Sequence, residues 1–497
     1  MRELDEGSRP SGESDSGESV EPAARSGSSW SEPAAISTYL CARALGLVSL
    51  VAFVSLHVQL DGLFGSEGLA PLAPRLARLD VWQAPSLLFV TGASDHALHG
   101  LVVLGELGSI GLAVGVLPGL SALVAWACYA SFLDLGWPFL PLQWDTLLSE
   151  SLILAAVASP WDRAWISPRA LPQGHVLPRV AIAFLACRLH VASGLVKLLS
   201  GDSTWADLSA LEHHFETEPL PTPLAPFVHA LPPFVLAMMV LAVYALEIVL
   251  PLAAIVRRAR IGVVAGLVAL QLAIVLTGNF GFFNALSALL TLPLLDDAQL
   301  ARGLARLRAR FVVEREASRG RAVSSVLAVA LMLSGALDLY ATVGGMLPEP
   351  IAAARASLSR LHLTSEYGPF GVMTTVRREI VLEVSEDGRV WTELSFPYNP
   401  GDPARGLPIV PLHMPRLDWM LWFAALGEPD DAPWLLGLER ALLDDRPAVR
   451  ALLDAPPPIG RIRLVRAVRY RYRYARDGEH VWIRDEREPF GPTLTRR

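Results

Sequence analysis

Apolar residues in this chain gather into long blocks that are separated by short polar or arginine-rich connections. A helix needs about 20 predominantly apolar residues to cross the hydrocarbon core of a bilayer. Nine blocks approach or reach this length, and we predict a polytopic α-helical membrane protein with about nine spans. The predicted spans are 38–60, 97–116, 119–136, 142–159, 178–200, 233–256, 261–278, 281–295 and 322–345. The tight pairs within 97–136 and 261–295 form helical hairpins, in which a re-entrant helix is an alternative to a full crossing.

Beyond residue 345 the pattern changes to the period of two that is typical of β-strands. Residues 379–384 form one predicted strand, residues 386–388 a hairpin turn, and residues 391–398 its partner. Between 461 and 474, arginines alternate with apolar and tyrosine residues, which predicts a strand with one arginine face and one aromatic face. Residues 416–453 have a helical pattern. We therefore expect a small β-rich domain with a helical insertion, and a sandwich is the candidate architecture.

Three regions follow from this pattern. Residues 1–36 are acidic and rich in Ser, Gly and Pro, so they cannot bury enough apolar surface to fold and are expected to form a disordered cytosolic tail. Their negative charge differs from the positive start of a signal peptide, so no cleavage is expected. Residues 37–345 form the multi-span transmembrane domain. Residues 346–497 form the C-terminal β-rich extracytoplasmic domain.

The distribution of arginine predicts the orientation in the membrane. Short cytoplasmic loops carry an excess of Lys and Arg. The arginine-rich connections are 160–179, 257–260 and 302–321, and all three fall on the cytosolic side if the N-terminus is cytosolic and nine spans are present. The opposite loop, 201–232, contains no Lys or Arg and five acidic residues. This arrangement delivers the C-terminal domain to the non-cytosolic side.

Composition supports a membrane protein and narrows its function. The chain is 52% hydrophobic and 18% charged, whereas soluble proteins carry about 25% charged residues. The net charge is −7 and no basic cluster lies in a nucleic-acid-binding context, which disfavours nucleic acid as a partner. Cys41, Cys128 and Cys187 are the only cysteines and lie in apolar blocks, so the C-terminal domain has no disulfide. No motif indicates a cofactor or a metal site.

Six ionisable residues lie inside the predicted spans, where such groups are costly and often functional. They are Glu106, Glu150, Arg188, His190, Glu247 and Asp338. Arg188 requires a carboxylate partner at this depth, and Glu150 and Glu247 are the candidates. Two interpretations stay open, a set of structural ion pairs that fixes helix packing and a ligand or reaction site.

Lys197 is the only lysine among 42 Lys and Arg residues. The chain evidently uses Arg wherever a plain positive charge is sufficient, so a solitary Lys indicates a need for a compact ammonium or a group that can lose its proton. His190 lies seven residues earlier and shares its helix face. The alternative is a lysine at the outer end of a span that extends its ammonium toward water.

The outer loop and the last strand hold further candidates. His213, His214 and Glu216 have metal-ligating side chains, but their spacing matches no recognised site and favours a solvated loop. The arginine face of 461–473 is either a solvated sheet face or a docking surface for acidic partners, among them the acidic loop 202–218 of the same chain.

Several stretches resemble the lipase maturation factor family, in order and over nearly all of residues 40–490. These stretches are 142–145, 193–202, 204–205, 214–217, 219–223, 276–284, 370–375 and 415–419. The resemblance implies a membrane protein that assists the folding and assembly of exported client polypeptides. The clients that the resemblance implies are lipases. It implies the endoplasmic reticulum membrane in a eukaryote and the plasma membrane in a bacterium, which the preference for arginine favours. The residues that we expect to face clients are Trp205, His213, His214, Glu216, Trp419 and Trp422.

A more distant likeness, over about a dozen residues from Gly194 to Trp205, links the chain to the vitamin K-dependent gamma-carboxylases. It implies an alternative function, an intramembrane enzyme in which Lys197 is the base on a quinone or lipid substrate, assisted by His190 and Arg188. We favour the non-enzymatic interpretation, because the first resemblance covers the whole chain and no recognised catalytic motif is present.

Overall fold

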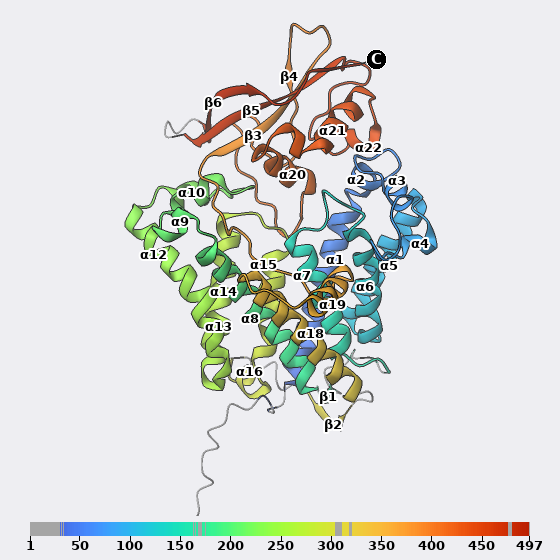
Figure 1. Ribbon diagram of the computed structural model, residues 1–497, viewed down its shortest axis with the longest axis vertical. Helices are drawn as coiled ribbons and strands as arrows, with labels where there is room; N and C mark the ends of the chain where they lie inside the picture. Colours follow the sequence, from blue (N-terminus) through green and yellow to red (C-terminus); the bar gives the residue numbers. More distant parts are fainter. Residues whose placement is uncertain are drawn as a thin grey trace, which may run out of the picture.

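The computed structural model describes residues 30, 32, 34–162, 164, 166, 171–173, 175–303, 311–317, 321–475 and 480–496. Figure 1 shows a helical body with a sheet-containing domain at one end. Most of the predicted tail 1–36 and much of the arginine-rich stretch 302–321 lie outside the described residues, as do Arg163 and Arg169.

Six helices in the described part of the chain are long and apolar enough to cross a membrane. They are α1 (Ala35–His57), α5 (Asp95–Val114), α8 (Val176–Leu199), the segment Pro233–Ile255 that begins with α12 (Pro233–Tyr244), the segment Arg257–Thr277 that contains α14 (Arg260–Thr277), and α18 (Arg321–Thr342). Only 22%, 28% and 22% of the apolar windows of the last three segments are buried, and their exposed side chains are largely apolar, which is the surface that lipid tails cover. The chain is therefore an integral membrane protein.

The other three predicted spans correspond to shorter helices in the same body. They are α6 (Pro118–Leu133), α7 (Gln143–Ala158) and α15 (Phe283–Leu289), which continues into η4 (Leu292–Leu294). Helix α7 is buried along almost its whole length between α6 and α8. Because protein surrounds α7, this helix does not need the long apolar surface that a lipid-facing helix presents to the bilayer. The total of nine spans stays a prediction.

The two ends of the helical body are distinct. Asp297 of α16 (Asp297–Gly303) accepts hydrogen bonds from the backbone at the start of α1, and Arg257 pairs with Asp296 beside it at 2.6 Å. This end also holds the parallel pair β1 (Leu171–Gln173) and β2 (Val313–Ala317). The opposite end carries the short helices α2 (Leu60–Phe64), α3 (Leu72–Leu76), α4 (Leu88–Thr91), α9 (Ser203–Ala206), α10 (Ala210–Thr217) and α11 (Ala225–His229) (Figure 1).

The C-terminal domain is one antiparallel sheet of five strands in the order β4-β3-β5-β6, with β7 beside β5. The strands are β3 (Arg377–Ser385), β4 (Thr392–Glu393), β5 (Leu464–Tyr474), β6 (Trp482–Pro489) and β7 (Leu494–Thr495). The described residues of this domain form no second sheet, so the sandwich architecture was wrong. Strand β3 pairs over nine residues with β5, far away in the sequence, whereas the predicted local partner contributes only the two residues of β4.

Helices inserted between β4 and β5 cover one face of the sheet. They are α20 (Arg416–Ala425), α21 (Pro433–Leu443) and α22 (Pro447–Arg450). Ile380, Leu382 and Val465 pack against them, and the opposite face carries a cluster that includes Tyr472 and Trp482. These helices lie between the sheet and the helical body (Figure 1), so the insertion joins the two parts of the molecule.

The segment between α18 and β3 follows the helical body before it enters the sheet. It contains α19 (Glu349–Arg360), and the Tyr367 hydroxyl beyond it donates to Glu150 of α7 at 2.8 Å. The backbone N–H of Gly368 donates to Gln143. The segment therefore packs on α7, and the sheet itself begins at Arg377.

Candidate functional site

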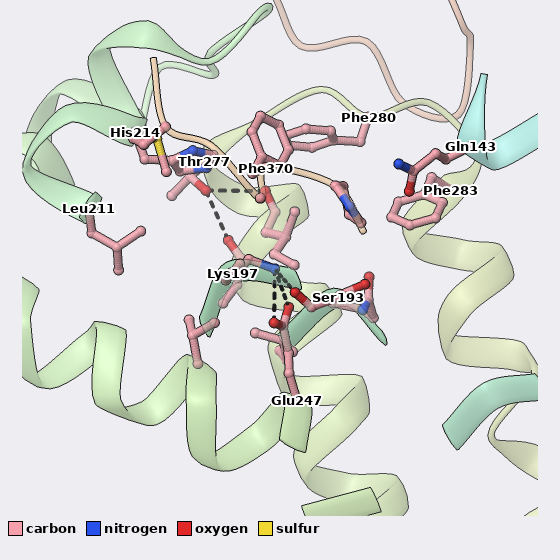
Figure 2. Close-up of a pocket in the computed structure, with 18 of the residues that line it drawn as sticks. Gln143, Ser193, Lys197, Leu211, His214, Glu247, Thr277, Phe280, Phe283 and Phe370 are labelled. Carbon is pink, nitrogen blue, oxygen red and sulfur yellow. Dashed lines mark hydrogen bonds and ion pairs between the residues drawn. The ribbon is translucent and has the colours of Figure 1, made fainter. Parts of the chain in front are cut away.

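A cavity of about 880 Å³ lies where the helical body meets the C-terminal domain. Its wall comes from α7, α8, the segment after α12, α14, α10, the backbone stretch 368–374 and α20. Figure 2 shows Lys197 and Glu247 below the aromatic rings of Phe280 and Phe370 in the cavity wall. The lining is predominantly apolar and aromatic, with few polar groups, which is typical of small-molecule sites.

Lys197 and Glu247 form a buried ion pair at this cavity. The ammonium lies 2.9 and 3.1 Å from the two carboxylate oxygens and 3.2 Å from the carbonyl oxygen of Ser193 (Figure 2). The side chains are 6% and 9% exposed, and the indole of Trp205 lies 5.6 Å from the ammonium. Three acceptors match the three N–H donors of a lysine. Of the two candidate partners of Arg188, Glu247 pairs instead with Lys197.

Two backbone features bring these residues together. Glu247 lies in η1 (Ala245–Val249), one turn of π-helix after α12, a distortion that is frequent at functional sites. Gly194 of α8 faces this turn, where an added Cβ would lie 2.5 Å from Cγ1 of Ile248 and 3.0 Å from Cβ of Glu247. The absence of a side chain at Gly194 therefore allows α8 to approach the π-helical turn closely enough for the ion pair.

The two histidines at the cavity, His190 and His214, are surrounded differently. Nδ1 of His190 lies 2.8 Å from the carbonyl oxygen of Ala186, and Nε2 lies 3.2 Å from the amide nitrogen of Gln271. This geometry fits a neutral ring whose Nδ1–H donates and whose Nε2 accepts. Burial, aided by the charge of Lys197, lowers the pKa of His214 to about 4. The cavity therefore offers no uncompensated positive charge at neutral pH.

A second buried cluster joins α7, α8 and α18 away from the cavity. One nitrogen of Arg188 lies 2.5 and 2.6 Å from the two carboxylate oxygens of Glu150, and the other lies 3.4 Å from Asp338. Asp338 also pairs with Arg355 of α19 at 2.6 Å. The structure brings Arg188 and Glu150 together, but neither they nor Asp338 line the cavity. This cluster fits the structural interpretation, because its charges are matched inside the helix packing.

Glu106 lies in a third group, at the contact of α1 and α5. Its carboxylate is 2.8 Å from Nδ1 of His57, whose Nε2 is 3.0 Å from Nδ1 of His99. Nε2 of His99 lies 2.8 Å from Asp61. The group is partly exposed and far from the cavity residues in the helical body.

The resemblance stretches around 142–145 and 415–419 meet in space. Arg416 of α20 forms two hydrogen bonds with Asp145 of α7, at 2.7 and 3.0 Å, and both side chains are fully buried. The hydroxyl of Tyr129 donates to the same carboxylate. Trp144 and Trp419 pack edge to face with ring centroids 4.7 Å apart. These contacts were not predicted, although both stretches are among the motifs that carry the family resemblance.

The indoles that were expected to face clients lie inside the molecule. Trp205, Trp419 and Trp422 are 3%, 2% and 5% exposed, and all three line the cavity. Trp205 donates to the carbonyl of Phe370, and Trp422 donates to the carbonyl of Thr217. None of the three rings lies on the outer surface, because the stretch at Phe370 packs on Trp205, and α20 presents Trp419 and Trp422 to the helical body.

Residues of the acidic loop 202–218 contact the start of β3 and the end of β5. Glu216 accepts a hydrogen bond from the backbone of Tyr474 at 3.1 Å, and His213 is half-buried. Arg377 donates to carbonyl oxygens of Glu216, Glu218 and Pro219. Within the described residues, no group of three or more His, Cys, Asp or Glu side chains is arranged to hold a metal ion.

The arginine face of β5 is neutralised within the sheet. Arg469 pairs with Glu488 at 2.6 Å, and Arg471 pairs with Glu486 at 2.7 Å. Arg473 pairs with Asp485 at 2.5 Å, again on the neighbouring strand β6. The acidic loop 202–218 therefore meets Arg377 and Tyr474 and is not held by these three arginines.

Comparisons with known proteins agree with the resemblance. A family model described as the lipase maturation factor transmembrane domain matches residues 37–302, and one described as the lipase maturation factor C-terminal domain matches residues 363–492. Lipase maturation factor 2 of Homo sapiens is 31% identical, over 90% of this chain and 81% of its own length. Lipase maturation factor 1 of Bos taurus is 29% identical, over 92% of this chain and 88% of its own length.

No solved structure matches the chain. The two family models together cover both the helical body and the sheet domain, and the relatives align over nearly the whole chain. The chain belongs to the lipase maturation factor family.

Proposed function

We propose that this protein is a membrane-bound maturation factor that assists the folding or assembly of exported proteins, with lipases as the client class. The observation that carries the proposal is the match to lipase maturation factors over 90% of the chain, including both the helical body and the C-terminal domain. The relatives are named for lipase maturation, and the two family models cover every residue that lines the cavity.

The proposal includes the expected orientation, with the C-terminal domain on the non-cytosolic side of the plasma membrane or the endoplasmic reticulum membrane. Arg179, Arg257 and Arg258 lie at the end of the helical body where α1 begins. The C-terminal domain contacts the other end of α1, where Gln59 donates to the carbonyl of Met414. A cytosolic arginine-rich end therefore supports a client-accessible domain outside the cytosol.

The helical contacts favour a scaffold over the enzyme alternative. A lysine that acts as a base needs a free lone pair, whereas the ammonium of Lys197 has three acceptors, two of them on a carboxylate. Arg188 is held by Glu150 and Asp338 away from the cavity, so it is not grouped with Lys197 as an enzyme site would need.

Export of a lipase tests the proposal. A lipase is produced in a host that contains or lacks this chain, and activity per unit of lipase protein is measured outside the cytosol. We expect the chain to raise this specific activity without changing lipase synthesis. Equal specific activity in both hosts, for several exported lipases, would overturn the proposal.

Variants of the ion pair separate the scaffold from the enzyme. Lys197→Met leaves Glu247 buried and unpaired, which lowers the melting temperature of the protein and its maturation activity. Lys197→Met combined with Glu247→Leu replaces the pair by apolar side chains, a change that is often neutral or stabilising for buried pairs. We expect the double variant to recover both properties. Recovery of stability with complete loss of maturation would instead support a lysine base.

A further inference from the structure

We propose that the open side of the cavity binds incompletely folded segments of exported polypeptides in which large apolar residues stand next to Lys or Arg. Such a site deepens the proposed maturation function, on which it rests, because it names the chemistry of the client segment. The binding surface combines exposed apolar side chains of the cavity wall with carboxylates of the acidic loop 202–218 that have no basic partner.

Large apolar residues of the cavity wall are exposed on the side of the C-terminal domain. Val372, in the stretch 368–374 that precedes the sheet, is 71% exposed. Phe423 and Leu426 of α20 and Leu224, between α10 and α11, also line the cavity and are exposed. We call these four residues the apolar rim. Exposed apolar residues that surround an open cavity are typical of a binding surface.

Acidic side chains lie beside the apolar rim. The carboxylate of Asp202 accepts a hydrogen bond at 2.8 Å from the backbone nitrogen of Met373, the neighbour of Val372. Asp207 is exposed, and Glu212 is half-buried on the same loop. Within the described residues, none of these three carboxylates forms an ion pair with Lys or Arg. They are therefore available to a basic group from a partner.

The positive groups around this loop are neutralised. Lys197 is held by Glu247, and Arg377 pairs with Glu379 at 2.5 Å. The stretch 201–232 contains no Lys or Arg. His214 is neutral at pH 7, because burial and the charge of Lys197 lower its pKa to about 4. The surroundings of the apolar rim therefore carry negative charge, which attracts Lys and Arg and repels anionic ligands.

An incompletely folded polypeptide matches both features. Folded proteins bury most of their large apolar side chains, so a mature enzyme presents few of them to this surface. An immature chain exposes such residues, and a Lys or Arg next to one of them can reach the carboxylates while the apolar side chain enters the cavity. Binding ends when the client buries these residues, which distinguishes an immature client from a mature one.

Lipid is the alternative occupant of the cavity. Ala242, Ala269 and Ala273 also line it and are exposed on the segments that face the bilayer. A hydrocarbon chain fits this part of the wall, but it makes no contact that uses the charge of the acidic loop. The charge beside the apolar rim favours the polypeptide, and an assay in the presence of a bilayer decides between the two occupants.

Equilibrium binding of fluorescent peptides to the purified full-length protein in phosphatidylcholine nanodiscs tests the proposal. The probe is a short peptide in which Phe and Leu alternate with Lys. One comparison peptide has Glu in place of Lys, and a second has Ser in place of Phe and Leu. Empty nanodiscs measure the binding to lipid alone.

We expect the lysine probe to bind saturably, with a single site per chain, and the serine peptide to bind weakly. At low salt the lysine probe should bind roughly tenfold more tightly than the glutamate peptide, because it can pair with exposed carboxylates. This difference should become smaller at high salt, since salt screens interactions between exposed charges.

A double variant of the apolar rim tests where the probe binds. Val372→Ser with Phe423→Ser removes apolar surface from the rim and should weaken binding by roughly tenfold. Val390→Ser with Ile409→Ser changes two exposed apolar residues outside the cavity wall and is the matched control. The control should leave the affinity unchanged, and melting temperatures verify that both proteins are folded.

A second double variant tests the role of the carboxylates. Asp207→Asn with Glu212→Gln should lower the preference for the lysine probe over the glutamate peptide by roughly fivefold. Glu386→Gln with Asp444→Asn changes two largely exposed carboxylates of the C-terminal domain and should leave the preference unchanged.

The proposal is overturned if no peptide binds saturably, if the lysine and glutamate peptides bind equally, or if the folded rim variant binds as well as its control. Binding that is present in detergent and lost in nanodiscs would assign the cavity to lipid and would also overturn the proposal. Peptide binding is measured with purified protein and lipase maturation in cells, so a failure of this site is distinguishable from a failure of the maturation function.

Discussion

Arg416 is the residue on which the junction between the two parts of the molecule depends most directly. It is fully buried, pairs with Asp145 through two hydrogen bonds, and also donates to the hydroxyl of Tyr129 and the carbonyl of Phe139. The planar guanidinium of Arg416 and the planar carboxylate of Asp145, joined by two hydrogen bonds, fix both the distance and the orientation between the two side chains. The pair thus holds α20 of the C-terminal domain in one position against α7.

Asp145→Asn should destabilise this junction. The variant leaves the guanidinium of Arg416 buried without a counter-charge, which typically costs about 3–5 kcal/mol. We expect a lower melting temperature of the purified full-length protein and faster proteolysis between the helical body and the sheet. Asp444→Asn, at a largely exposed ion pair with Arg446, is the control and should have little effect. Equal melting temperatures for the two variants would contradict the assigned role.

Glu439 makes the stability of the C-terminal domain sensitive to pH. Burial raises the pKa of this carboxyl from 4.5 to about 8, and its Oε1 atom has no hydrogen-bond partner among the described residues. Between these two pH values the folded state binds more protons than the unfolded state. The free energy of unfolding therefore falls as the pH rises from about 4.5 to 8, and the loss is complete above pH 8.

Glu439→Gln should remove this dependence. We expect the variant to be more stable than the unmodified protein at pH 8.5 and similar to it at pH 5, as measured by thermal unfolding of the full-length protein. Glu386→Gln changes a largely exposed carboxyl in the same domain and should shift stability little at either pH. An equal effect of Glu439→Gln at both pH values would refute the assignment.

At the scale of elements, periodic patterns predicted what local sequence determines. Strand β5 was predicted from its alternation, and the structure places it at Leu464–Tyr474 with Tyr470 and Tyr472 buried on one face. The predicted hairpin is present, but it pairs β3 with β4 over only two residues, and the long pairing of β3 is with β5, far away in the sequence. Which strands pair depends on packing against α20 and α21, and no local pattern encodes that contact.

Gly194 tests whether a close helix contact builds the ion pair. Alanine normally stabilises a helix interior relative to glycine by about 1 kcal/mol. At Gly194 the added Cβ would meet Ile248 and Glu247 on η1, so we expect Gly194→Ala to lower the melting temperature. Gly100 in α5 has no atom within 4 Å of the equivalent position, so Gly100→Ala is the matched control and should be neutral or stabilising. A stabilising effect of both substitutions would exclude close packing at Gly194.

At the scale of the whole molecule, the sequence identified residues of the candidate site without their arrangement. Lys197 and His190 were singled out from composition and helix spacing, and both line the cavity. Trp144 and the partner of Lys197 were missed. Helices α7, α8 and α14, the π-helical turn η1, and α20 each contribute one part of the wall, and tertiary packing alone joins them. Glu150 and Glu247 lie in two different predicted spans. Their positions in the sequence could not show which of them contacts Arg188 and which contacts Lys197.

The arrangement of the ends also constrains the number of crossings. Helix α1 runs from the arginine-rich end, where Asp297 binds its first residues, to the C-terminal domain, where Ser55 lies 2.9 Å from the backbone nitrogen of Met414. The six long helices alone are an even number and would return the chain to the end where it started. An odd number of crossings therefore requires that shorter helices such as α6, α7 and α15 also connect the two ends.

Cysteine accessibility tests this topology and its orientation. In a chain whose Cys41, Cys128 and Cys187 are replaced by alanine, single cysteines are introduced as Arg461→Cys in the sheet domain or Arg258→Cys at the opposite end, both exposed positions. We expect a membrane-impermeant maleimide to label the first in intact cells and the second only after permeabilisation. This result follows from arginines at the cytosolic end and an odd number of crossings. Labelling of both positions from the same side would mean an even number of membrane crossings between them. The reverse pattern would place the C-terminal domain in the cytosol, where it has no access to exported lipases.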